Sequence, residues 1–321
     1  MNHRWPTSLH SQTEALFHGI RSIREKKKSN PFGIHSFGSW DSYRNHAHRF
    51  VDFMIGKDRT SLLDTRSVHD DMAEYLEHIL TYYAEKKRSR QTMETLLSAL
   101  GKFEYALNRY IEMYYHDVPL LESEPLRLEY YARSRSLLRK SSRIFDNRAY
   151  PDPVQLIANI RNKTFQLQAS LQYEGGLRAE GVGAPSNRRL KNPLTASCLR
   201  GIINDPVSRM VIGIVATVEK GGKETEHYVS LRTYRRLEQY VKEFGKLESD
   251  YFEYVAAINE AARVTGQYSP GRGSHGLKHN FAQERYLECI DHGLKHEQAL
   301  QQTSLETSHF RLRETLTYTR G

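Results

Sequence analysis

Residues 210–218 read Met-Val-Ile-Gly-Ile-Val-Ala-Thr-Val, and residues 227–231 read His-Tyr-Val-Ser-Leu. The first run is rich in β-branched residues and the second contains Tyr and Val, a composition that favours strands. Between them stands Gly221-Gly222, flanked by Lys220 and Lys223. A Gly-Gly dipeptide between two such runs is typical of a hairpin turn. The sequence therefore predicts a β-hairpin with lysines at its tip.

Helical patterns surround this hairpin. Apolar residues recur at three- and four-residue steps from Trp40 to Met54, where Ser39 can cap the helix, and again over Val68–Tyr83 and Met93–Ile111. A further helix is expected over Pro153–Tyr173, and helices dominate again after the hairpin. The chain is therefore predicted to be mainly α with a small β-sheet, an α+β fold.

Charge and turn residues divide the chain into four segments. Residues 1–35 are predicted to form a basic N-terminal arm, either a solvated tail or a contact to DNA, and residues 36–125 a small helical domain. Residues 126–152 contain the basic run Arg133–Arg143 and then Pro151-Asp152-Pro153, which predicts a linker that is either solvated or lies along a phosphate backbone. Residues 153–321 form the second domain.

Composition narrows the class of protein. The 321 residues carry a formal net charge of +9 and the pI is about 9.3, which favours a polyanionic partner because binding to phosphates releases condensed counterions. No apolar run is long enough to cross a membrane, and no signal peptide is apparent, so we expect a cytoplasmic protein. The two cysteines, Cys198 and Cys289, and the scattered histidines do not have metal-ligand spacing, so neither a metal nor a cofactor is predicted.

Four short motifs follow one another in the second half of the chain. They are an apolar stretch that ends in Gly176-Leu177-Arg178, the lysine of the hairpin tip, the run Ser274–Tyr286 that contains His275 and Lys278, and the run Ser304–Tyr318 in which His309 precedes Tyr318 by nine residues. Each has an ordinary explanation by itself: a surface arginine, solvent-facing lysines, a helix capped by Ser274, a tyrosine in helix packing. In this order they resemble the tyrosine recombinase, or phage integrase, family.

The resemblance implies six catalytic residues. They are Arg178, Lys220, His275, Lys278, His309 and Tyr318. Tyr318 would attack a phosphodiester to give a 3′-phosphotyrosyl intermediate, and Lys220, with Lys223 in reserve, would protonate the leaving 5′ oxygen. Arg178, His275, Lys278 and His309 would hold the charged phosphate. No cofactor would be needed.

Two positions depart from the family pattern. Lys278 occupies the place of a second arginine, so that the charge is kept but the bidentate fork is lost. Gly181 stands where the family often has an acid, and Glu180 lies one residue earlier. Beyond Tyr318 only Thr319, Arg320 and Gly321 follow, too few for a further helix. A second hypothesis is therefore a DNA-binding relative with impaired or lost catalysis.

The resemblance also implies partners and domain roles. Residues 36–125 would be a core-binding domain and residues 153–321 the catalytic domain, closing on double-stranded DNA at attachment or recombination sites. A homotetramer on synapsed DNA, assisted by accessory DNA-bending proteins, is expected. The stretch Gly293–Leu300 resembles a subgroup from bacterial mobile elements, which implies a nucleoid-associated protein. A type IB topoisomerase would use the same chemistry, and a helical structural protein could carry the motifs by chance.

Overall fold

The computed structural model describes residues 5–23, 25, 28–139, 147–187, 189–219, 223–308, 315, 316 and 319. The chain divides into two units, Met1–Ser142 and Arg143–Gly321. Each unit has its own hydrophobic core. Among the described residues, no helix combines the length and the apolar character that crossing a membrane requires.

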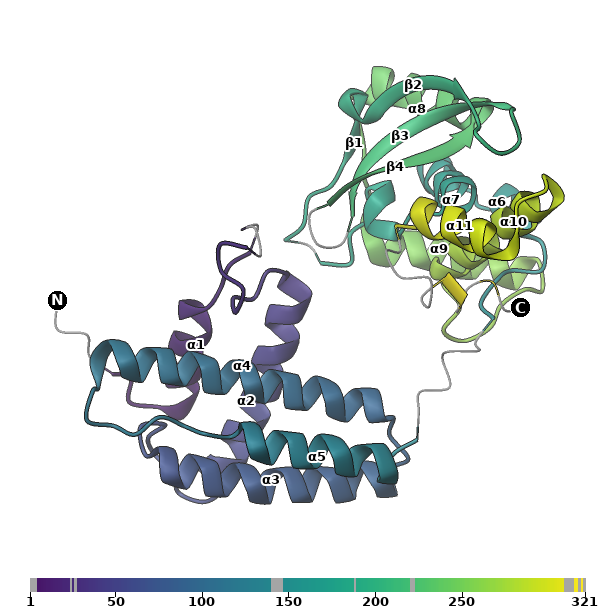
Figure 1. The fold of residues 1–321 in the computed structure, drawn as a ribbon. Coiled ribbons are helices and arrows are strands. Elements are labelled where there is room, and N and C mark those ends of the chain that lie inside the picture. Colours follow the sequence, from purple (N-terminus) through teal and green to yellow (C-terminus); the bar gives the residue numbers. More distant parts are fainter. Residues whose placement is uncertain are drawn as a thin grey trace. The chain divides into compact units, whose positions relative to one another are not determined.

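The regular elements of the first unit are all helices over its described residues. Its helices are α1 (Leu9–Gly19), α2 (Phe37–Ile55), α3 (Thr65–Glu85), α4 (Arg90–Tyr114) and α5 (Glu124–Leu137). Helix α5 contacts both α3 and α4, and α2 packs on α4 and α1 (Figure 1). In the core, the rings of Phe50 and Phe103 meet edge to face with centroids 5.7 Å apart. The predicted helices of residues 36–125 are confirmed, except that α2 begins at Phe37 and is capped by Ser36 rather than Ser39.

The structure corrects the prediction of an N-terminal arm for residues 1–35. Leu16, Phe17 and Ile20 are buried in the core of the first unit, and Arg21 forms a parallel bridge with Ile34. The segments on both sides of the basic run are therefore packed onto the unit rather than extended as an arm. The linker prediction for residues 126–152 is corrected in the same way, because α5 occupies its first half and Tyr130 is buried.

The second unit combines helices with two small antiparallel sheets. Its helices are α6 (Pro153–Ala158), α7 (Lys163–Gly175), η2 (Ala179–Val182), η3 (Ala196–Cys198), α8 (Leu231–Phe244), α9 (Tyr251–Val264), α10 (His275–Asp291) and α11 (His296–Glu306). Its strands are β1 (Leu194–Thr195), β2 (Leu199–Asn204), β3 (Val211–Glu219), β4 (Lys223–Ser230) and β5 (Lys246–Leu247). The predicted mainly α protein with a small β-sheet is confirmed.

The larger sheet has the strand order β2-β3-β4. The predicted hairpin is β3 and β4, paired from Ile212–Ser230 down to Glu219–Lys223. Helix α8 packs on this sheet, and α7, α10 and α11 lie together beside β4 (Figure 1). Strand β2, for which no strand was predicted, pairs with β3. The helix predicted over Pro153–Tyr173 is two helices, because the Asn162 side chain accepts from the backbone N–H groups of Thr164 and Phe165 and starts α7 anew.

Candidate active site

The turn that carries Arg178 is fixed against α10. Gly176 ends α7 with φ +64°, a left-handed conformation that favours glycine. A Cβ at this position would overlap the ring of Phe281 in α10, so the turn and α10 approach as closely as glycine allows. Leu177 is fully buried, and Arg178 follows at the start of η2, half-buried. The chain thereby places Arg178 beside α10.

The hairpin is joined to the same turn. The imidazole Nδ1 of His227 lies 2.8 Å from the carbonyl oxygen of Gly175, to which it donates. The Glu174 carboxylate accepts from the backbone N–H of Ser230 and from the hydroxyl of Thr233. Strand β4 is therefore hydrogen-bonded to the end of α7 at two points: His227, in the middle of the strand, and Ser230, its last residue.

The first turn of α10 carries His275 and is packed against the segment that enters the unit. Asn280 hydrogen-bonds to both the N–H and the carbonyl of Tyr150, each at 2.8 Å, and the Tyr150 hydroxyl donates to the carbonyl of Gly273. Ser274 makes no capping hydrogen bond through its side chain, contrary to the prediction. The helix start is thus held by tertiary contacts rather than by a local cap.

His275 lies in a strongly cationic environment. Burial, and then the positive charges of His279, Lys278, Arg148 and Arg178, lower the pKa of His275 to about 3. His275 is therefore uncharged at neutral pH. The same interactions place Arg178, which is far from the other two predicted residues in the sequence, in one neighbourhood with His275 and Lys278. Arg148, which the sequence motifs did not indicate, belongs to this neighbourhood as well.

Lys278 is buried. Its side chain has no exposed surface, and its Nζ donates to the carbonyl oxygen of Thr307 at 2.7 Å. Thr307 caps the end of α11 and lies near the start of the run Ser304–Tyr318, the last of the four motifs. Lys278 therefore connects the helix that bears His275 to the chain that leads toward His309 and Tyr318.

Arg285 provides a second connection between α10 and the end of α11. Its guanidinium donates to both carboxylate oxygens of Glu306 and to both of Asp205, at 2.7–2.8 Å, and all three side chains are buried. Glu288 accepts a further hydrogen bond at 2.6 Å. Arg285 lies within a predicted motif but has no predicted role, because its partners are far away in the sequence. The network fixes the end of α11 to α10 and to the β2–β3 turn.

Three predicted residues, Lys220, His309 and Tyr318, lie outside the described residues. Lys223, the reserve for Lys220, opens β4 opposite Glu219. Gly181 is buried in η2, where its N–H donates to the carbonyl of Arg178, and Glu180 is half-buried beside it. The described part of the chain contains no cluster of three or more His, Cys, Asp or Glu side chains suited to a metal ion.

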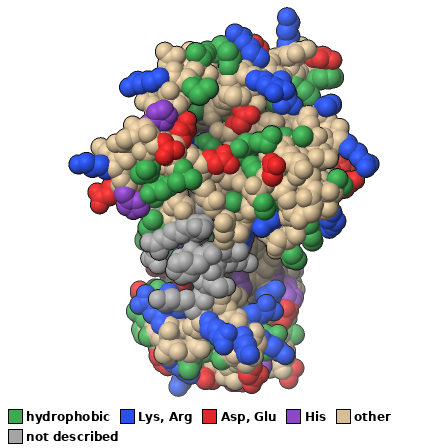
Figure 2. Space-filling model, turned by 90° about the vertical axis from the view of Figure 1, so that its right-hand side faces the viewer, with side chains coloured by type: hydrophobic (Ala, Val, Ile, Leu, Met, Phe, Trp, Pro, Cys, Tyr) green, Lys and Arg blue, Asp and Glu red, His purple; other side chains and the backbone are tan. Residues whose placement is uncertain are grey.

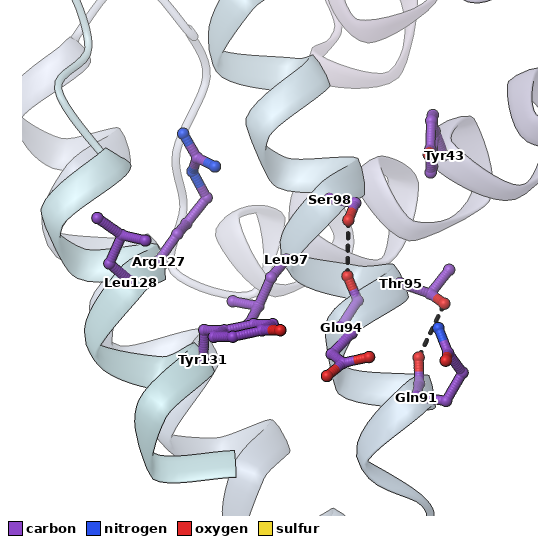
Figure 3. A pocket seen from close by; sticks show the side chains of 9 residues that line it. All are labelled: Tyr43, Gln91, Glu94, Thr95, Leu97, Ser98, Arg127, Leu128 and Tyr131. Atoms are coloured by element: carbon purple, nitrogen blue, oxygen red, sulfur yellow. Dashed lines mark hydrogen bonds between the residues drawn. The ribbon is translucent and has the colours of Figure 1, made fainter. Parts of the chain in front are cut away.

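Two surface hollows lie away from these residues. One, of about 430 Å³, is in the first unit between α4 and α5; Arg127 and Tyr131 of α5 and Glu94 and Ser98 of α4 are among its lining residues (Figure 3). The other, of about 720 Å³, is in the second unit between the α6–α7 turn and α9. On the face drawn in Figure 2, Lys and Arg side chains occur over both units with Asp and Glu among them. The three predicted catalytic residues that the structure describes, Arg178, His275 and Lys278, line neither hollow.

The helical first unit and the α+β second unit share the fold of solved site-specific recombinase and integrase structures, as the order of motifs predicted. No protein-family model and no curated protein matches the sequence. Solved structures do match the fold. The XerH site-specific recombinase bound to difH substrate, in a pre-cleavage complex, aligns over 97% of this chain and 81% of that chain with a TM-score of 0.56 and 14% identity. Its post-cleavage complex with palindromic difH gives a TM-score of 0.54 at 14% identity, over 97% and 80%.

A third match is a lambda integrase (75–356) dimer bound to a COC′ core site. It covers 97% of this chain and 95% of that chain, with a TM-score of 0.51 and 12% identity. Each of the three matches is a complex with a substrate or a core site. At these identities the likeness establishes the fold.

Proposed function

We propose that the chain is a site-specific tyrosine recombinase that cleaves and rejoins double-stranded DNA. The observation that carries this proposal is the gathering of Arg178, His275 and Lys278 at the junction of α7 and α10, on a fold shared with a site-specific recombinase and an integrase. Two cationic side chains beside an imidazole suit a phosphodiester, whose charge increases as a pentavalent phosphorus develops. A helical structural protein would have no reason for this arrangement.

In the proposed reaction, the phenolic oxygen of Tyr318 bonds to phosphorus while the bond from phosphorus to the 5′ oxygen breaks. Lys220 gives a proton to the departing 5′ oxygen, and the phenolic proton passes to a base. His275 is the described candidate for that base: its imidazole is uncharged at neutral pH, and the negative charge of a bound phosphate would offset the cations that lower its pKa, so that the ring can accept a proton. The 3′-phosphotyrosyl bond keeps the energy of the phosphodiester, and attack by another 5′ hydroxyl reverses the step on a new strand.

The test is formation of a covalent protein–DNA adduct. A cognate site nicked close to the cleavage position traps the intermediate, because the short fragment with the 5′ hydroxyl diffuses away. The wild-type chain should form a denaturation-resistant adduct that Tyr318→Phe abolishes. Tyr286→Phe is the matched control, since Tyr286 is a tyrosine of α10 that bonds to His296. Absence of an adduct from the wild type on its authentic site contradicts the proposal.

A second candidate is a DNA-binding relative with impaired catalysis, favoured by the buried amine of Lys278 and by Gly181 in place of an acid. Lys278→Arg distinguishes the two. A gain in adduct formation would support impairment, whereas equal rates for both versions would contradict it. Supercoil relaxation without synapsis would instead indicate a type IB topoisomerase.

The assembly belongs to the same proposal. The first unit serves as the core-binding domain and the second as the catalytic domain. We expect four chains on two synapsed DNA sites, with accessory DNA-bending proteins, in a bacterial protein from a mobile element that works on the nucleoid. Sedimentation of the chain with and without two-site DNA measures the number of chains. A complex that never exceeds two chains on such DNA would contradict the expected tetramer.

A further inference from the structure

Arginine at position 278 would give the candidate site a second planar guanidinium, and the chain has Lys278 there instead. An ammonium is a point charge and cannot donate to two phosphate oxygens in one fixed plane. In addition, Lys278 is fully buried and donates to the carbonyl of Thr307 at 2.7 Å. This contact joins two parts of the protein, so position 278 does not supply a second guanidinium for a bound phosphate.

The backbone of Arg148 lies against the start of α10, beside the candidate site. Its carbonyl oxygen is 2.6 Å from the point where a Cβ on Gly276 would stand, so its backbone runs directly against the first turn of α10, between His275 and Lys278. Two residues later Tyr150 is held to α10 by the paired hydrogen bonds of Asn280. The position of Arg148 is therefore fixed relative to His275 by both packing and hydrogen bonds.

The positive charge of Arg148 also acts on a residue of the candidate site, His275. It acts on His275 together with the charges of Lys278 and Arg178, and its side chain is half-buried. The neighbouring Arg272 donates to the carbonyl of Gln267 at 2.6 Å and lies over the ring of Tyr150. The charge that the segment before α6 brings to His275 is therefore that of Arg148.

We propose that Arg148 is a further phosphate-binding residue of the candidate active site and supplies the guanidinium that position 278 lacks. This inference rests on the proposed function, because the anion concerned is the scissile phosphate of a DNA strand. Arg148 and Arg178 reach the site from different segments, one before α6 and one after α7. Together they offer two forks of N–H donors to the two non-bridging oxygens.

The first experiment measures adduct formation on two versions of the nicked cognate site. With an ordinary phosphate at the cleavage position, Arg148→Gln should slow adduct formation about 10²- to 10³-fold, the effect of removing one donor to a developing oxyanion, and Arg148→Lys should recover part of it. With a methylphosphonate, which carries no negative charge there, wild type and Arg148→Gln should react at nearly equal rates. Arg161→Gln is the matched control, since Arg161 is an exposed arginine that faces Glu260.

Two results of this experiment would overturn the inference. One is an Arg148→Gln variant that reacts like the wild type on the ordinary phosphate. The other is an equal loss on both substrates, which would indicate a structural role for Arg148 without a contact to the phosphate charge.

The second experiment does not need catalysis. The imidazole of His275 is titrated by NMR in the full chain, with and without inorganic phosphate as the probe. In the wild type, phosphate should raise the pKa of His275, since a bound anion favours the imidazolium, and Arg148→Gln should reduce that rise. A rise of the same size in both proteins would overturn the inference. If the wild type forms no adduct but the rise depends on Arg148, the proposed function fails and the anion site stands.

Discussion

The guanidinium of Arg285 binds the carboxylate of Glu306 through two hydrogen bonds, of 2.7 and 2.8 Å, within the interior of the second unit. The same guanidinium is bidentate to Asp205. One cation thus faces two buried anions and the partly exposed Glu288. Such a cluster tolerates the loss of its cation poorly, because the remaining carboxylates would be buried without compensation.

Replacement of Arg285 by Met should therefore lower the free energy of unfolding of the second unit by roughly 3–5 kcal/mol. Urea unfolding followed by circular dichroism measures this change. Arg235→Met is the control, because Arg235 pairs with Glu238 on the surface, where both side chains are largely exposed, and it should cost less than about 1 kcal/mol. Similar losses in the two variants would show that the buried cluster contributes no more than a surface pair.

Ionisation of Asp205 should contribute to the pH dependence of the free energy of unfolding. Burial opposes ionisation of this carboxyl, but hydrogen bonds from Arg285 and Ser208 outweigh it and hold its pKa well below the usual range. An acid with a lowered folded-state pKa stabilises the fold above its unfolded pKa, near 3.8, and this contribution is lost as the pH falls below that value. Glu306 has the opposite trend, since burial raises its pKa despite Arg285.

We expect the free energy of unfolding of the wild type to decrease as the pH is lowered from about 5 to 2, and that of Asp205→Asn to decrease less over that range. Unfolding in urea at several pH values measures both. An unchanged slope in Asp205→Asn would mean that other carboxyls account for the acid sensitivity.

Gly176→Ala should destabilise the turn that bears Arg178. The alanine would have to adopt φ +64° and would meet the ring of Phe281. Gly266→Ala is a matched control, because Gly266 has φ +69° but nothing within 4 Å of its Cβ position. The control should lose about 1–2 kcal/mol for the left-handed backbone alone, and Gly176→Ala about 1–3 kcal/mol more for the close contact.

Chemical denaturation of both glycine variants gives the difference directly. If the contact is responsible, Phe281→Leu should recover part of the additional loss in the double variant. Equal losses at the two glycines would show instead that the turn and α10 can separate at little cost.

Binding to duplex DNA should depend steeply on salt. If the chain neutralises roughly six to ten phosphates, its affinity should fall about 10³- to 10⁵-fold between roughly 50 and 200 mM salt. Fluorescence anisotropy with a labelled duplex measures the slope of log K against log salt. Affinity that is unaffected by salt would argue against a phosphate-dominated interface and against the proposed function.

Local patterns predict much of the fold. The β3–β4 hairpin follows from two strand-forming runs around Gly221-Gly222, and α3 and α4 from their three- and four-residue periodicity. Strand β2 does not follow from the pattern, because it is an edge strand that is exposed over most of its length and its sequence has no strict alternation. The arm is a wrong prediction because the basic run is more conspicuous than Leu16, Phe17 and Ile20, whose spacing is helical.

The candidate site is predictable only in part. Arg178, His275 and Lys278 stand in short motifs, and the structure places them in one neighbourhood. The burial of Lys278 and its hydrogen bond to Thr307 cannot be predicted from the sequence, since they depend on how α11 packs on α10. Arg148 and the Arg285 network depend in the same way on contacts between distant segments.

The Arg285 cluster joins segments that are made at different times during synthesis of the protein. Asp205 precedes Arg285 by 80 residues, and Glu306 follows it by 21. All three side chains can therefore pair only after Glu306 has been synthesised. A chain that stops before Glu306 lacks the ion pair that holds the end of α11 to α10.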